Sequence, residues 1–65
     1  MIDPCEALNI AIERAGGTNA LGRILGISHA AVTQWDITPV RRVLEIERLT
    51  GVSRHDLRPD IYPRE

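Results

Sequence analysis

The chain has 65 residues, so it holds at most one small domain with a marginal core and cannot enclose a large catalytic cleft. Hydrophobic residues make up 43% and charged residues 26%, a balance typical of a globular rather than a disordered chain. Eight basic residues, all arginine, against nine acidic residues give a formal net charge of −1, which by itself does not favour a nucleic-acid binder.

The first predicted helix begins after Asp3, a good N-cap residue, with proline at its first position and Glu6 completing a capping box. It ends at Gly16-Gly17, because glycine adopts the left-handed conformation at low cost. An apolar stripe along this helix predicts its core face, formed by Cys5, Leu8, Ala11, Ile12 and Ala15. We therefore expect Cys5 to be buried as a small hydrophobic residue.

Residues 18–37 carry the pattern of a helix-turn-helix. Thr18 is expected to cap a helix that stops at the turn glycine Gly26, and Ser28 to cap a second helix over 28–36. Gly22 lies where the two helices approach each other. Val32 and Trp35 recur on one side of the second helix, so we expect the indole to lie in the core rather than against a base.

A fourth helix is predicted from Thr38 as cap and Pro39 at the first position to Gly51. Its inner side is expected to hold Val40, Val43, Leu44 and Ile46. Ser53 with Asp56 then predicts one further turn ending before Pro59, followed by an extended tail over 59–65. The chain as a whole is predicted to be a single all-α domain, 1–65, of four helices plus a short C-terminal helical turn.

The C-terminal segment allows two interpretations. Glu47 is expected to pair with Arg54 or Arg58, and His55 to be merely solvated. Large apolar residues in a tail either fold back over a core or bind a partner, so the pair Ile61 and Tyr62 is predicted to do one or the other. The second possibility makes these two residues a dimer contact.

Residues 18–37, TNALGRILGISHAAVTQWDI, resemble the helix-turn-helix of phage Cro and repressor proteins. The flanking AIERAGGTNALGRILGIS and VLEIERLTGVSRHDLRPDIYP resemble YdaS-type, Cro-like regulators of phages and prophages, so the resemblance covers about Ala7 to Pro63. It implies a sequence-specific regulator, a repressor that reads a double-stranded DNA operator in the major groove with helix 28–36. A location in the bacterial cytosol is expected because no secretory signal is visible at the N-terminus. It also implies a homodimer on DNA that is weak or monomeric when free. Two departures are Gly22 in place of the commoner alanine and the absence of lysine.

The predicted reading face is the outward side of the second helix. With Val32 and Trp35 turned inward, the outward residues are Ser28, His29, Ala30, Thr33 and Gln34. These side chains offer an amide for adenine, an imidazole for guanine, and methyl groups for thymine. Phosphate contacts are predicted for a second set, formed by Thr18, Asn19, Arg23, Arg41 and Arg42.

Other functional classes find little support in the sequence. A lone cysteine excludes an internal disulfide, and no zinc-ligand spacing, phosphate loop or nucleophile–base pair is present, so we expect no cofactor, no metal and no catalysis. The apolar runs are too short to span a membrane. The alternative to a DNA-binding regulator is an antitoxin-like or protein-interaction module with weak or incidental DNA binding, which the near-neutral charge favours.

Overall fold

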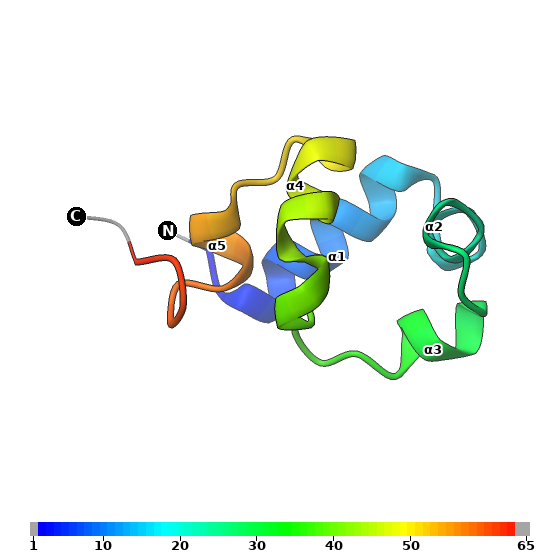
Figure 1. Ribbon diagram of the computed structural model, residues 1–65, viewed down its shortest axis with the longest axis horizontal. Helices are drawn as coiled ribbons and strands as arrows, with labels where there is room; N and C mark the ends of the chain where they lie inside the picture. Colours follow the sequence, from blue (N-terminus) through cyan, green and yellow to red (C-terminus); the bar gives the residue numbers. More distant parts are fainter. Residues whose placement is uncertain (1, 64–65) are drawn as a thin grey trace.

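The computed structural model describes residues 2–63, in which five α-helices and one 3-10 turn are joined by short connections. In chain order these are α1 (Pro4–Ala15), α2 (Thr18–Leu25), α3 (His29–Thr33), η1 (Val40–Arg42), α4 (Val43–Thr50) and α5 (Arg54–Leu57). No strand occurs within residues 2–63, which confirms the all-α prediction. The molecule is elongated, with α5 near one end and the α2–α3 pair at the other (Figure 1).

Helix α1 begins and ends as its local sequence predicts. The Asp3 carboxylate accepts a hydrogen bond from the Cys5 amide at 2.8 Å, and Gly16 ends the helix with a φ of +102°. The buried side, however, is formed by Ala7, Leu8 and Ala11, while Cys5 is exposed. The prediction of a buried cysteine is wrong, because at roughly 100° per residue Cys5 lies more than a quarter turn away from the centre of that buried side.

Helices α2 and α3 form the two arms of the predicted helix-turn-helix, with two local differences. Thr18 does not cap α2: it is the first helical residue, and Gly17 takes the cap position at a φ of +108° without any side-chain hydrogen bond. Ser28 caps α3 as predicted, accepting from the Ala31 amide at 3.2 Å. Helix α3 is shorter than the predicted 28–36, because the chain leaves the helix after Thr33 and brings Trp35 against the core.

The turn between these helices depends on close backbone contact. Gly26 adopts a φ of +76°, and the Ile27 amide donates to the Gly22 carbonyl at 2.8 Å. An ideal Cβ on Gly22 would lie only 2.8 Å from the Ile27 carbonyl oxygen. The glycine at position 22 therefore permits the close approach that the sequence predicts there.

The segment after α3 departs most from prediction. Thr38 caps no helix: its side chain is fully buried and its hydroxyl has no hydrogen-bond partner among the described residues. Helix α4 is preceded by η1, and only Val43 and Ile46 of the predicted inner residues are buried. Val40 and Leu44, expected inside, are 51% and 50% exposed. They face outward because Val43 and Ile46 already occupy the side of α4 that packs on α1.

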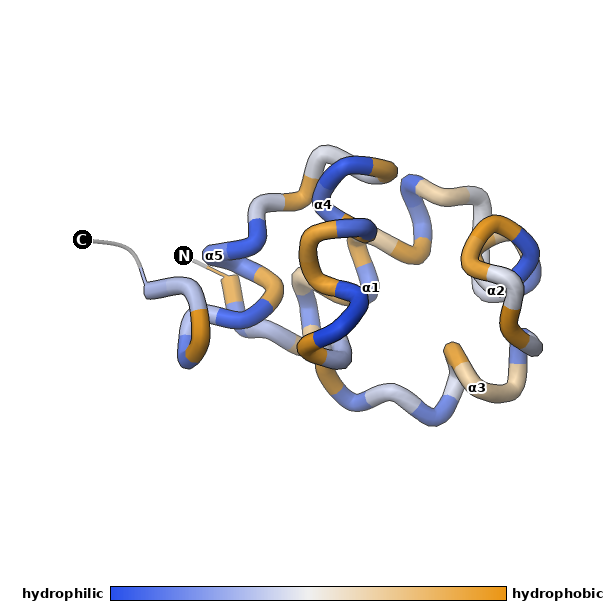
Figure 2. Tube along the Cα trace, viewed as in Figure 1, coloured by the Kyte–Doolittle hydropathy of each residue, from blue (hydrophilic) through white to orange (hydrophobic). Residues whose placement is uncertain are grey.

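The core is organised around α1, which contacts α2, α4 and α5. The main cluster of buried residues comprises Ala7, Ala11, Val43, Ile46, Val52 and Leu57, with Ile2, Ile10, Trp35 and Tyr62 packed partly against it. Figure 2 shows the matching alternation of apolar and polar stretches along α1 and α4. Leu21 of α2 and Val32 of α3 are also buried, so each helix of the helix-turn-helix has its own buried apolar residue.

The C-terminal segment is not extended as far as the structure describes it. The amides of Ile61 and Tyr62 both donate to the Arg58 carbonyl, at 3.1 and 2.8 Å, and so form a turn. His55 is not merely solvated, since its Nδ1 lies 2.8 Å from the Tyr62 carbonyl oxygen. These hydrogen bonds hold the tail against α5, so the described part of the tail is not extended. Residues 64 and 65 of the predicted tail lie outside the described residues.

The predicted pairing of Glu47 is confirmed for one of its two candidates. Glu47 accepts from both the amide and the guanidinium of Arg54, at 2.8 and 3.0 Å. Arg58 instead forms a two-pronged pair with Asp60, and its third hydrogen bond goes to the Thr38 carbonyl at 3.0 Å. The hydrogen bonds between these two side chains raise the pKa of the Arg58 guanidinium and lower the pKa of the Asp60 carboxyl below its ordinary value.

Candidate nucleic-acid interface

The outer side of α3 carries the residues that the sequence predicts to read DNA bases. All five residues of the predicted reading face are exposed, namely Ser28, His29, Ala30, Thr33 and Gln34. On the inner side of this segment, Val32 of α3 is only 1% exposed, and Trp35, just past the end of the helix, is half-buried against the main core. The orientation predicted for this segment, with the indole inward and the glutamine outward, is the orientation found.

Some polar groups of this face already form hydrogen bonds within the protein, and others do not. The Ser28 hydroxyl caps α3, and the Thr33 hydroxyl donates to the His29 carbonyl at 2.8 Å. The imidazole of His29 and the amide of Gln34 form no hydrogen bond with any described residue. These two side chains therefore keep their donors and acceptors free for a ligand, whereas Thr33 offers chiefly its methyl group.

Helix α2 brings a second group of predicted residues next to α3. Asn19 and Arg23 are exposed and Thr18 is half-buried, and α2 packs directly against α3. The first amides of α2 lack a side-chain cap, so they remain available to an anion. Arg23 forms no ion pair with any described residue. The charge near the reading face is nevertheless modest, because Arg23 is the only cation on α2 or α3.

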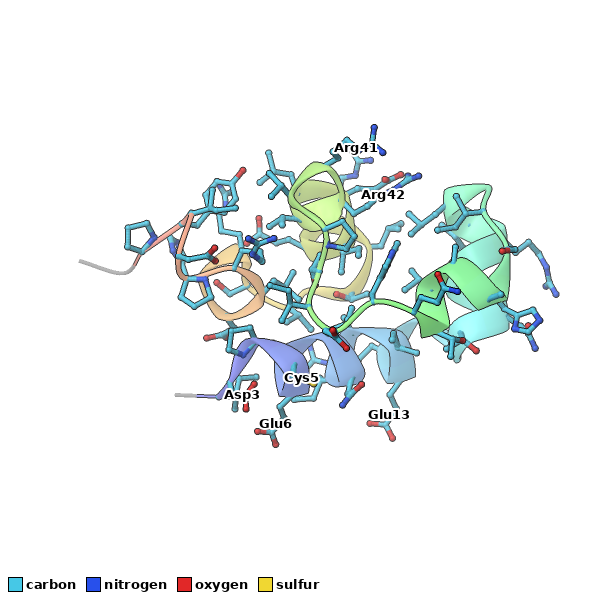
Figure 3. All side chains as sticks on the ribbon, turned by 90° about the horizontal axis from the view of Figure 1, so that it is seen from below. Asp3, Cys5, Glu6, Glu13, Arg41 and Arg42 are labelled. Atoms are coloured by element: carbon cyan, nitrogen blue, oxygen red, sulfur yellow. The ribbon has the colours of Figure 1, made fainter. Side chains whose placement is uncertain are left out.

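The remaining two predicted phosphate contacts lie on a different element. Arg41 and Arg42 belong to η1, which contacts α4 and no other described helix. Figure 3 shows them on the side of the molecule opposite Glu6 and Glu13 of α1. Arg42 is paired with Glu45 at 3.2 Å, while Arg41 is exposed and has no ion pair with a described residue. The fold thus does not bring these arginines into direct contact with α3.

The two predicted tail contacts separate in the structure. Tyr62 is half-buried and packs against the core, and the guanidinium of Arg54 lies 5.7 Å from its ring centre. Ile61 remains 38% exposed. The fold-back interpretation therefore describes Tyr62, whereas Ile61 alone keeps an apolar surface free for a partner.

Sequence reasoning missed the tie between Arg58 and the Thr38 carbonyl, which joins the last turn to the segment that follows α3. No local signal could have revealed it, since the two residues are 20 positions apart. Reasoning from the sequence also missed the outward position of Val40 and Leu44. Their apolar character matches the helical period equally well inside or outside.

Three further observations concern other kinds of site. Within residues 2–63, no group of three or more histidine, cysteine, aspartate or glutamate side chains could hold a metal ion. The described part of the chain forms no pocket, and none of its helices is long and apolar enough to cross a membrane. The candidate site is therefore the exposed outer side of α3 rather than a pocket among the described residues.

Comparison with known proteins gives one match. The model of a family described as bacterial toxin YdaS matches residues 8–65, which is nearly the whole chain and includes α2, α3 and α4. No curated protein and no solved structure matches the chain.

Proposed function

The chain belongs to the bacterial toxin YdaS family, and from this premise we propose that it is a sequence-specific binder of double-stranded DNA that regulates transcription. In this proposal α3 enters the major groove and α2 lies across the backbone, as in helix-turn-helix regulators. The observation that supports it is the orientation of this segment. His29 of α3 and Gln34 at its C-cap are exposed with free polar groups, while Val32 and Trp35 face inward.

Base recognition follows from the chemistry of those side chains. In a bidentate contact with adenine, the Gln34 amide nitrogen can donate to N7 and its oxygen can accept from the exocyclic N6 amine. His29 can donate to N7 or O6 of guanine. Ala30 and the Thr33 methyl can contact the thymine methyl group. Because Ser28 caps the helix, its hydroxyl contributes mainly by fixing the angle at which α3 begins.

Phosphate contacts position the domain without selecting sequence. Thr18, Asn19 and Arg23 lie beside α3 and are the nearest candidates. Arg41 and Arg42 supply a second contact region, in which Arg42 must share its charge with Glu45. Two or three phosphate-neutralising cations give a log–log salt slope of roughly −2 to −3, which is shallow for a DNA-binding protein.

The experiment that tests the proposal is selection of bound duplexes from a random pool, followed by affinity measurement on the selected site and on a scrambled one. Gln34→Ala should lose about 1–3 kcal/mol of preference for the selected site while keeping its affinity for scrambled DNA. Asn9→Ala, on the exposed side of α1, is the matched control and should change neither. Equal discrimination by Gln34→Ala and the parent would show that α3 does not read bases.

The symmetry of the selected sites tests the proposed homodimer. A two-fold site with half-sites about one helical turn apart indicates two subunits on one face of the duplex. Ile61, as the exposed apolar residue of the tail, is the candidate contact between them. A single asymmetric site would instead assign DNA binding to the monomer.

A toxin or antitoxin role that acts through a protein partner is the second candidate function. The family description names a toxin, and the net charge of −1 does not favour DNA binding. Titration with mixed-sequence duplex at low salt separates the two functions. Measurable binding there favours the DNA-binding regulator, and its absence favours the protein-directed role.

A further inference from the structure

Helix α4 and the turn η1 before it carry both buried and exposed apolar residues, and only the buried ones are used by the core. Val43 and Ile46 are fully buried against α1, while Val40 and Leu44 are 51% and 50% exposed. Leu44 and Arg48 lie one helical turn apart on one side of α4, and the exposed Val40 and Arg41 belong to η1, the 3-10 turn that leads directly into that helix. We call these four residues the α4 outer face.

The charges on the α4 outer face are not neutralised by any described residue. Arg41 and Arg48 are exposed and form no ion pair with any described residue. The carboxylates nearest in sequence are already engaged, since Glu45 pairs with Arg42 and Glu47 with Arg54. The face therefore presents two apolar side chains beside two free cations, with no competing anion from α4 itself.

We propose that the α4 outer face is a docking surface for an acidic amphipathic helix of a second protein. A partner helix with apolar side chains one turn apart can cover Val40 and Leu44, and carboxylates beside that stripe can pair with Arg41 and Arg48. The apolar contact supplies affinity, and the two charge pairs select an acidic partner over a basic one.

A second copy of this chain fits the surface less well. Two-fold pairing of α4 outer faces would bring like charges together, which is unfavourable. The acidic outer side of α1, which carries Glu6 and Glu13, offers the right charge, but none of the exposed large hydrophobic residues lies on that helix. An anionic membrane is also a weaker fit, because α4 has eight residues and two free cations give little surface attraction.

Three of the four residues of the α4 outer face have no part in the proposed DNA contacts. Arg41 is a candidate phosphate contact, but Val40 is not, and neither are Leu44 and Arg48. Variants at these two positions therefore test the partner surface alone, and duplex binding by the same variants reports separately on the proposed function.

The probe is a synthetic helical peptide of about 18 residues, long enough to be partly helical on its own, with leucines at i, i+3 and i+7 flanked by glutamates. A second peptide replaces every glutamate by lysine. Titration calorimetry measures binding to the full chain, and methyl NMR shifts locate it. We expect the acidic peptide to shift the Val40 and Leu44 methyl signals and the basic peptide to bind at least about tenfold more weakly.

Two variants and one control give the result its meaning. Leu44→Ala should weaken binding of the acidic peptide about fivefold to tenfold. Arg48→Glu should weaken it at least about fivefold and strengthen binding of the basic peptide, an exchange of preference that a merely structural effect would not produce. Leu49→Ala, an equally apolar change on a different side of α4 at a residue 42% exposed, should leave both affinities unchanged.

Several outcomes would overturn the proposal. These are absence of binding by the acidic peptide, equal binding of both peptides, or methyl shifts centred elsewhere. Self-association of the free chain that Leu44→Ala abolishes would assign the surface to a second copy. Retention on anionic vesicles that Arg48→Glu abolishes would assign it to a membrane. Unchanged duplex binding in the Leu44 and Arg48 variants would leave the proposed function standing in every case.

Discussion

Replacing Gly22 by alanine tests the packing of the helix-turn-helix directly, because two opposing effects of known size meet at one atom. Alanine favours a helix interior over glycine by about 1 kcal/mol, so propensity alone predicts a more stable protein. The new Cβ, however, would lie 2.8 Å from the Ile27 carbonyl oxygen and 3.3 Å from the His29 amide nitrogen. Both are backbone atoms, so neither can move aside without displacing the turn.

The steric effect should win. Overpacking of this kind costs about 1–3 kcal/mol, which leaves a net loss of roughly 1 kcal/mol after the gain in helix propensity. In a domain of this size a loss of 1 kcal/mol lowers Tm by about 4–8 °C. Because the clash pushes α3 away from α2, Gly22→Ala should also disturb the Ile27–Gly22 hydrogen bond and alter the entry of α3.

Thermal unfolding followed by circular dichroism measures the stability, and amide NMR shifts over residues 27–35 measure the displacement. Gly26→Ala is the matched control: nothing lies within 4 Å of its added Cβ, so its cost comes only from the φ of +76°. It should destabilise without the same pattern of shifts across α3. A Gly22→Ala variant with a raised Tm and unmoved α3 amides would refute the close-approach explanation.

Three further predictions concern the core, the C-terminal ion pair and the cysteine. Leu8→Ala, at a residue 1% exposed, should cost about 2–5 kcal/mol in urea unfolding, whereas Ile24→Ala, at 52% exposed, should cost about 0.5 kcal/mol or less; equal losses would contradict the assigned core. The bond with Arg58 lowers the pKa of Asp60, so its contribution to stability is complete above the ordinary carboxyl pKa of 3.8 and is lost as pH falls through the lower folded value. Asp60→Asn should therefore be less stable than the parent at neutral pH and show a smaller further loss below pH 3.8, measured by denaturation across a pH series; parallel curves would dismiss the pair as a stabilising contact. The exposed Cys5 thiol should react with a thiol reagent in the folded protein as fast as in a short peptide, and strong protection would contradict its placement.

Local signals were sufficient for most of the helix ends. Asp3 and Ser28 cap α1 and α3, and Gly16, Gly26 and Gly51 end α1, α2 and α4 with left-handed φ values. Such signals can be recognised in a sequence because each depends on hydrogen bonds and φ preferences within a few residues. The outward position of Gln34 and the inward position of Val32 were predictable for a related reason, since one helical turn with a clear apolar side has only one way to face the core.

Tertiary structure alone decided which apolar residues of α4 are inside. Val40, Val43, Leu44 and Ile46 satisfy a helical period on either of two sides, and the contact with α1 selects Val43 and Ile46. Tertiary structure also decided the tie from the Arg58 guanidinium to the Thr38 carbonyl, because these residues are 20 positions apart in the sequence. Periodicity reports that a side chain is apolar, but burial depends on which other side chains compete for the same small core. Local sequence patterns therefore determined most of the helix ends of this protein, and packing determined which apolar side chains stay exposed.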